Sequence, residues 1–207
     1  MKTKILLVRH GQTDWNTKNL IQGDSDFSRL TEEGRRQTRL VKERLIREKI
    51  RIDAVYSSPL ERAIETANML KPDGMEIRIM DSLRERHFPA SLEGKTFDEN
   101  IRKRKKLFET WKRIRELPGV KDVETVREVK IRSYKAHMKI AKENMGKTVL
   151  VVSHGGFIKN LVLAVKRKPA SYLNEFDIDN CSITVLEYDE KKLRVVKIND
   201  TRHLTAR

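Results

Sequence analysis

Residues 5–11 read Ile5-Leu6-Leu7-Val8-Arg9-His10-Gly11, four consecutive aliphatic residues that stop abruptly at a basic pair and a glycine. A short aliphatic run bounded by polar residues is typical of a strand that is buried on both faces. The same pattern recurs at Thr148–Val152, which precedes Ser153-His154-Gly155-Gly156. Each of these two strands is therefore predicted to end beside a histidine and a glycine, at the turn into the next segment.

Helical patterns alternate with the strands and cover, approximately, residues 31–49, 97–117, 123–144 and the segment from residue 157 onward. Shorter strands are predicted at about residues 53–57, 77–80, 183–188 and 193–198. Buried strands that alternate with helices favour an α/β fold. We expect a three-layer α/β/α sandwich, with a mostly parallel central sheet and helices on both faces. A chain of 207 residues fits one domain, residues 1–207.

Another helix is predicted to begin at Ser-Pro-Leu-Glu, residues 58–61, with Ser58 as its cap. Arg62 then lies in the first helical turn. In an α/β sheet, helix N-termini and the carboxyl ends of parallel strands share the edge at which ligands bind. This edge is expected to carry two guanidinium groups and two imidazoles, from Arg9, Arg62, His10 and His154.

These four side chains indicate a phosphate site. A single histidine is more often structural than catalytic, but here the arrangement of strand, histidine and glycine occurs twice. Guanidinium groups repel cations, so no metal site and no cofactor is predicted. Their planar forks match phosphate oxygens through paired hydrogen bonds.

Composition restricts the protein class. The chain has a net charge of +15, a single cysteine, Cys181, and no apolar run long enough to cross a bilayer, so we expect a cytoplasmic protein without an intrachain disulfide. The charge is compatible with nucleic-acid binding, with attraction of anionic metabolites or with a basic solvated surface. Its main concentration, from Arg102 to Lys106, falls in a predicted helix, where a solvated face is the simpler interpretation.

Residues 7–13, Leu-Val-Arg-His-Gly-Gln-Thr, with Trp15-Asn16, resemble the signature of the histidine phosphatase superfamily, also called the phosphoglycerate mutase-like family. Further segments match the family in the same order, at residues 22–23, 30–34, 57–63, 66–67 and 153–156. The resemblance extends over nearly the whole chain and implies the phosphoglycerate mutase-like fold.

The resemblance also implies roles for individual residues. His10 is expected to attack phosphorus, with phosphate contacts from Arg9, Asn16, Arg62 and His154. A backbone carbonyl that accepts one N–H of His10 would fix its tautomer, and His154 is expected to be cationic.

Glu85 is the best match for the family's carboxylate proton donor, with a surface ion pair to Arg84 or Arg86 as the structural alternative. Gln22, Gly23 and Gly155 are expected to complete the binding site. Asn16 could instead cap a turn, and Gln22 could satisfy a buried loop.

The expected activity is metal-independent hydrolysis of small phosphorylated metabolites through a phosphohistidine on His10. A cofactor-dependent phosphoglycerate mutase is the alternative, but such mutases carry longer lid insertions than residues 82–147, which are expected to supply much of the lid here. Residues 122–126 and 198–204 resemble segments of the family's small phosphatases. A basic nucleic-acid-binding protein is a third hypothesis. Nucleic acid and membranes are not the expected partners, and a homodimer is one expected assembly because dimers are common in the family.

Overall fold

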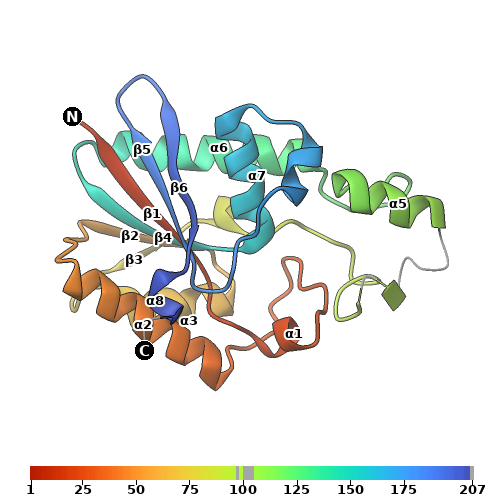
Figure 1. The fold of residues 1–207 in the computed structure, drawn as a ribbon, viewed down its shortest axis with the longest axis horizontal. Helices are drawn as coiled ribbons and strands as arrows, with labels where there is room; N and C mark the ends of the chain where they lie inside the picture. Colours follow the sequence, from red (N-terminus) through yellow and green to blue (C-terminus); the bar gives the residue numbers. More distant parts are fainter. Residues whose placement is uncertain (97, 100–104, 206–207) are drawn as a thin grey trace.

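The computed structural model describes residues 1–96, 98–99 and 105–205. A six-stranded sheet forms its centre, in the order β3-β2-β4-β1-β5-β6 (Figure 1). The strands are β1 (Thr3–Arg9), β2 (Ala54–Ser57), β3 (Ile77–Ile79), β4 (Thr148–Ser153), β5 (Ile183–Tyr188) and β6 (Leu193–Asp200). The first four strands run parallel, whereas β5 is antiparallel to β1 and β6 is antiparallel to β5. The predicted mostly parallel sheet is confirmed.

Helices cover both faces of the sheet (Figure 1). Residues of α2 (Glu32–Arg47) and α3 (Glu61–Leu70) share one hydrophobic cluster with the sheet, and residues of α6 (Val126–Glu143) and α7 (Gly155–Lys166) share another. The shorter elements are α1 (Asp14–Thr17), η1 (Asp81–Leu83), α5 (Lys105–Ile114), η2 (Ala170–Asn174) and α8 (Arg202–Thr205). This arrangement is the three-layer sandwich that the sequence predicts.

The aliphatic run of β1 explains why both faces are covered. Leu6 and Val8 contact the cluster of α2 and α3, whereas Ile5 and Leu7 contact the cluster of α6 and α7. Successive side chains of a strand point to opposite faces, so a run of four aliphatic residues needs a helix layer on each side. Truncating one of these side chains to alanine should cost about 2–5 kcal/mol.

One predicted helix begins later than expected, and another lies partly outside the described residues. Helix α3 starts at Glu61, and its N-cap is Leu60, which makes no side-chain capping bond, so the prediction that Ser58 caps the helix is wrong. Arg62 does lie in the first turn. The lid helix expected from Phe97 is described as α5 from Lys105 to Ile114; Phe97 and the side chains of the basic run from Arg102 to Lys106 lie outside the described residues.

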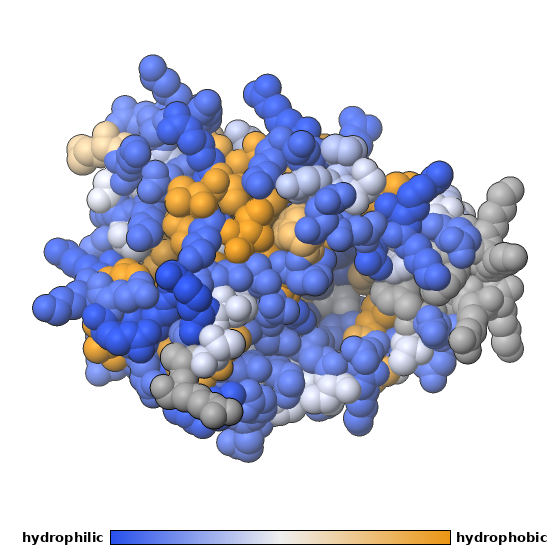
Figure 2. All heavy atoms as spheres, in the orientation of Figure 1, coloured by the Kyte–Doolittle hydropathy of each residue, from blue (hydrophilic) through white to orange (hydrophobic). Residues whose placement is uncertain are grey.

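Within the described ranges, none of the helices combines the length and apolar character that a membrane crossing demands. Figure 2 shows a largely hydrophilic face, in keeping with a sequence in which 36% of residues are charged. An apolar area lies over the region that β6 and α7 occupy in Figure 1.

Candidate active site

The two histidines directly follow the last residues of two neighbouring strands. β1 and β4 pair in parallel, with Arg9 opposite Ser153, so His10 and His154 follow the sheet at the same level. Their ring centroids are 5.2 Å apart, and the ring planes are inclined by 56°. Both side chains are buried. The sheet register alone therefore places the two imidazoles side by side.

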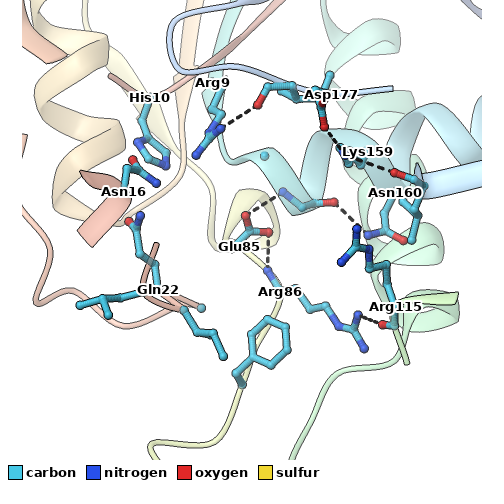
Figure 3. A pocket seen from close by; sticks show the side chains of 18 of the residues that line it. Arg9, His10, Asn16, Gln22, Glu85, Arg86, Arg115, Lys159, Asn160 and Asp177 are labelled. Carbon is cyan, nitrogen blue, oxygen red and sulfur yellow. Dashed lines mark hydrogen bonds and ion pairs between the residues drawn. The ribbon is translucent and has the colours of Figure 1, made fainter. Parts of the chain in front are cut away.

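A cavity of about 400 Å³ opens over this edge of the sheet (Figure 3). The sequence-predicted residues in its wall are Arg9, His10, Asn16, Gln22, Gly23, Arg62, Glu85 and Gly155. His154 completes the set, because its ring lies against that of His10. All nine predicted residues thus gather at one site.

His10 is held as a neutral imidazole. Its Nδ1 lies 2.8 Å from the carbonyl oxygen of Gly11, which can only accept a hydrogen bond, so Nδ1 carries the proton. Burial, followed by the charges of Arg62 and Arg9, lowers the pKa of His10 well below its ordinary value. Nε2 consequently keeps its lone pair at neutral pH, and the predicted carbonyl lock on the tautomer is confirmed.

Two buried guanidinium groups are fixed in place by backbone carbonyls. Arg62 donates from Nη1 to Ser25 (2.7 Å) and from Nη2 to Gly23 (2.8 Å), and Arg9 donates from Nη1 to Ile178 (2.7 Å). Burial lowers the pKa of Arg62 to about 10, so it remains a cation at neutral pH. These bonds use the terminal nitrogens, so the Nε–H groups of both arginines remain available to other acceptors.

Three buried nitrogens at this site have no hydrogen-bond partner among the described residues: Arg9 Nε, Arg62 Nε and His154 Nδ1. Buried polar groups are nearly always paired, so two unpaired ones on residues of the cavity wall and a third on the ring packed against His10 point to a ligand with several acceptor oxygens. Elsewhere in the described ranges, no three His, Cys, Asp or Glu side chains are grouped as a metal ion would require.

His154 differs from its expectation. Burial, then the positive charge of Arg62, lowers its pKa well below the ordinary value. The imidazole is therefore neutral, and the prediction of a cationic His154 is wrong for the protein without substrate. Its Nε2 lies 2.8 Å from Ser58 Oγ, a contact that the sequence did not predict.

Glu85 sits at the start of α7. Its carboxylate accepts hydrogen bonds of 2.8 Å from the backbone amides of Arg86, Gly156 and Phe157. A Cβ atom on Gly156 would lie 2.7 Å from Glu85 Oε1, which explains why glycine occupies this position. Anionic groups are stabilised at helix N-termini, and here the carboxylate faces the phosphate site (Figure 3).

The alternative for Glu85, an ion pair with a neighbouring arginine, is wrong. Arg84 pairs with Asp81, and Arg86 turns away to Glu116 at 3.1 Å. Glu85 is thus left to line the cavity together with His10 (Figure 3).

Asn16 and Gln22 each accept a hydrogen bond within the protein and also line the cavity. Asn16 Oδ1 accepts a bond from the Thr13 amide (3.0 Å) in a reciprocal cap of α1, so the capping alternative is correct as well. Gln22 Oε1 accepts a bond from Ser28 Oγ (2.9 Å). Both side chains lie in the wall of the cavity, where an amide can face a phosphate oxygen.

The far half of the cavity was not predicted. Its wall includes Phe88, Trp111, Arg86 and Arg115. The Arg86 guanidinium carbon lies 5.2 Å from the Phe88 ring centroid and 5.7 Å from that of Trp111, and Arg115 lies 5.5 Å from Trp111. Trp111 packs in a hydrophobic cluster with Ile21, Phe88 and Leu117 and also lines the pocket. Arg115 follows the last residue of α5 with a φ of 56°, a position without a sequence signature.

Known proteins match the chain over nearly its full length. A family model described as histidine phosphatase superfamily (branch 1) matches residues 5–201. The metal-independent phosphoserine phosphatase of Arabidopsis thaliana is 33% identical over 212 residues, 99% of this chain and 84% of that protein. A probable phosphoglycerate mutase of Photorhabdus laumondii is 34% identical over 197 residues, 89% of this chain and 85% of that protein. Bacillus stearothermophilus YhfR superimposes with a TM-score of 0.89 at 32% identity, covering 98% of this chain and 99% of that one.

Proposed function

Because the chain belongs to branch 1 of the histidine phosphatase superfamily, we propose that it is a phosphatase that hydrolyses small phosphomonoesters without a metal ion, through a phosphohistidine on His10. One observation carries this proposal. Two unpaired buried nitrogens, Arg9 Nε and Arg62 Nε, belong to residues that line the same cavity as His10, whose Nε2 lone pair is available, and a third, His154 Nδ1, belongs to the ring that lies against His10. A phosphoryl group supplies the oxygens that these nitrogens need and the phosphorus that Nε2 attacks.

In the first step, His10 Nε2 forms a bond to phosphorus while the bond to the ester oxygen breaks. Glu85, which takes up a proton when the phosphate anion binds beside it, gives this proton to the leaving alkoxide, which departs as an alcohol. The negative charge of the phosphoryl group is stabilised by the guanidinium groups of Arg9 and Arg62, which stay positively charged at physiological pH. Phosphoryl transfer depends mainly on positioning and charge stabilisation, and this buried clamp supplies both.

In the second step, water attacks the phosphohistidine. Glu85, now a carboxylate, takes a proton from the water, the P–N bond breaks and inorganic phosphate leaves. The backbone amides of Arg86, Gly156 and Phe157 hold the Glu85 carboxylate in place throughout. One carboxyl group can therefore serve as acid in one step and base in the next.

The far half of the cavity supports a small substrate that carries a second acidic group. Arg115 is half-buried beside Trp111, its Nε donates to Asn174 Oδ1 (2.9 Å), and its two terminal nitrogens can bind a carboxylate. Phosphoserine, the substrate in the name of the Arabidopsis relative, has this combination of phosphate and carboxylate. We therefore place phosphorylated amino or hydroxy acids first among the substrates.

We place the lid within residues 82–147, from which Glu85, Arg86, Phe88, Trp111 and Arg115 line the pocket. Phe88 and Trp111 from this segment pack together, with ring centroids 6.0 Å apart, above the phosphate site. α6, which the sequence analysis also assigned to the lid, packs instead on the sheet through Val129, Ala136 and Ile140. A lid made mainly of α5 and its flanking loops is small, which favours entry of water and hydrolysis over retention of the phosphoryl group by a mutase.

A phosphoester panel in the presence of EDTA tests the proposal, with 3-phosphoglycerate isomerisation measured in parallel on the wild type and on His10→Ala. We expect phosphate release from the wild type alone, unchanged by EDTA. Isomerisation faster than phosphate release would establish the mutase instead. Salt-sensitive retention on RNA without turnover would favour a nucleic-acid-binding protein.

A homodimer and a cytoplasmic location are part of the same proposal. β6 is an edge strand whose Val196 is 57% exposed, and an edge strand with an exposed apolar side chain is a surface that a second copy could cover. Cys181 is the single cysteine of the sequence, so an intrachain disulfide cannot form, which suits a reducing compartment. Sedimentation velocity of the wild type and of Val196→Lys tests the dimer.

A further inference from the structure

We propose that Ser58 is a positioning residue whose hydroxyl donates a hydrogen bond to Nε2 of His154, and so keeps the proton of that imidazole on Nδ1. The inference rests on the proposed phosphatase function, because its purpose is to present Nδ1–H to a phosphate bound beside His10. Sequence patterns assign Ser58 only the capping of a helix, a role that it does not fill.

The place of Ser58 in the fold is well defined. It follows the last residue of β2, its side chain is fully buried, and its backbone N–H donates to Val152 of the neighbouring strand at 3.0 Å. The side-chain oxygen then meets two groups: the backbone N–H of Leu60 at 3.3 Å and Nε2 of His154 at 2.8 Å. Ser58 thus connects the turn before α3 to the imidazole at the end of β4.

Counting protons gives the direction of the bond between Ser58 and His154. The Leu60 amide can only donate, so Ser58 Oγ accepts there and has one O–H to give. Within the described part of the chain, His154 Nε2 is the one acceptor recorded for that O–H. If Nε2 carried the proton instead, Ser58 would accept twice and its own O–H would be buried without a partner, at a cost of about 1–3 kcal/mol.

With Nε2 as acceptor, a neutral imidazole must carry its proton on Nδ1. This nitrogen is one of the three buried, unpaired atoms at the phosphate site, together with Arg9 Nε and Arg62 Nε. In the other tautomer, Nδ1 would present a lone pair to the phosphate oxygens and repel them. The Ser58 hydroxyl therefore selects the tautomer that binds an anion before any substrate arrives.

The same bond also opposes protonation of His154. An imidazolium would donate from Nε2 to Ser58 and leave the serine O–H unpaired, while adding a third positive charge beside Arg9 and Arg62. Burial and these charges already hold the pKa of His154 well below its ordinary value. The positive charge at the phosphate then comes from the two guanidinium groups, and His154 contributes a directed N–H.

Nitrogen-15 NMR of protein labelled at histidine tests the tautomer directly, at pH 7 and without substrate. The chain has five histidines, and the spectrum of His154→Gln identifies the signals of residue 154. In the wild type we expect Nδ1 with the chemical shift of a protonated nitrogen and Nε2 with that of an unprotonated one. In Ser58→Ala we expect a mixture of tautomers.

Steady-state kinetics provide the second measurement. Losing one directed donor in a catalytic site costs about 10²–10³-fold in kcat, and a mixed tautomer should cost less, about 10- to 100-fold for Ser58→Ala. Ser57→Ala is the matched control: Ser57 is the preceding buried serine, and its hydroxyl bonds only to the Ser58 carbonyl (2.9 Å). It should keep the wild-type tautomer and kcat within about threefold.

Nε2 protonated in the wild type, or an imidazolium at pH 7, would overturn the proposal, and so would Ser58→Ala with the wild-type tautomer and kcat. The wild-type spectrum decides even if Ser58→Ala does not fold. It also separates the two proposals, because absence of phosphatase turnover would reject the function while the tautomer remains measurable.

Discussion

Replacing Glu85 by glutamine separates proton transfer from the structural role of this side chain. The carboxylate accepts three backbone N–H bonds of 2.8 Å, two on Oε1 and one on Oε2. Glutamine keeps the shape and the oxygen that serves Arg86 and Phe157, but its NH₂ group faces the Gly156 amide. One charge-assisted bond is lost, about 1.5–3 kcal/mol, which lowers the melting temperature by about 3–12 °C in a chain of this size.

The kinetic effect should depend on the leaving group. An alkoxide needs a proton in order to leave, so we expect kcat/KM for an alkyl phosphate such as phosphoserine to fall by about 10²–10⁴-fold in Glu85→Gln. 4-Nitrophenolate leaves without a proton, so kcat/KM for 4-nitrophenyl phosphate should fall by less than about tenfold. Because the attacking water also loses its base, the variant should release one equivalent of nitrophenolate in a burst and then turn over slowly.

Both measurements are made at 25 °C, below the expected melting temperature of the variant. Glu116→Gln is the control, since Glu116 is a lid carboxylate that bonds to Arg86 (3.1 Å) and to the Val126 amide (2.8 Å) outside the cavity wall. Glu116→Gln should lower the melting temperature, and any change in kcat/KM should be the same for the alkyl and the aryl ester. Equal losses of kcat/KM for the alkyl and aryl esters in Glu85→Gln would refute a proton donor at this position.

Three further predictions address pH and charge. Because burial and two arginines lower the pKa of His10, kcat/KM corrected for substrate ionisation should stay level from about pH 7.5 to about pH 5.5. A fall in kcat/KM centred at pH 6.5, the ordinary pKa of histidine, would contradict a neutral nucleophile. Burial alone would raise the pKa of Asp200, but hydrogen bonds from three cations, one of them the buried Arg44 (2.7 Å), lower this pKa in the folded protein. The stabilisation by the Asp200 carboxylate is therefore present above the pKa of Asp200 in the unfolded chain, and it is lost as the pH falls through the lower pKa of the folded protein. Asp200→Asn should therefore cost about 3–5 kcal/mol in urea unfolding at pH 7, with the difference from wild type shrinking below about pH 4; an equal difference at about pH 3 would argue against the linkage. Arg115→Gln should raise KM for phosphoserine by about 10- to 100-fold and leave that for 4-nitrophenyl phosphate unchanged, while the exposed Arg113→Gln changes neither; a parallel rise for both esters would assign Arg115 to the lid structure.

Local sequence predicted the residues that depend on strand ends. The aliphatic runs before His10 and His154 identify two buried parallel strands, and adjacent parallel strands must end at the same edge. The positions of Arg9 and Arg62 follow from the same reasoning, so the core of the site was available without coordinates. The protonation state of His154 was not, because it depends on burial and on neighbours that are distant in sequence.

Ser58 shows why a strong local pattern can mislead. Serine followed by proline satisfies the rules for a helix start, but its hydroxyl is engaged by His154, 96 positions away in the sequence. The far wall of the cavity was missed for a related reason. Arg86 and Arg115 meet across a lid whose geometry is set by stacking on Phe88 and Trp111, and stacking between loops leaves no periodic signal in the sequence.

The register between β1 and β4 has a consequence for how the enzyme moves. The separation of the two imidazoles is fixed by main-chain hydrogen bonds at the centre of the sheet, where amide hydrogens exchange only when the whole domain unfolds. α5 lies at the periphery of the molecule (Figure 1), and we expect it to open in small excursions that leave these bonds intact. Access to the cavity and alignment of the nucleophile therefore belong to separate cooperative units, so evolution can remodel the entrance without disturbing the chemistry.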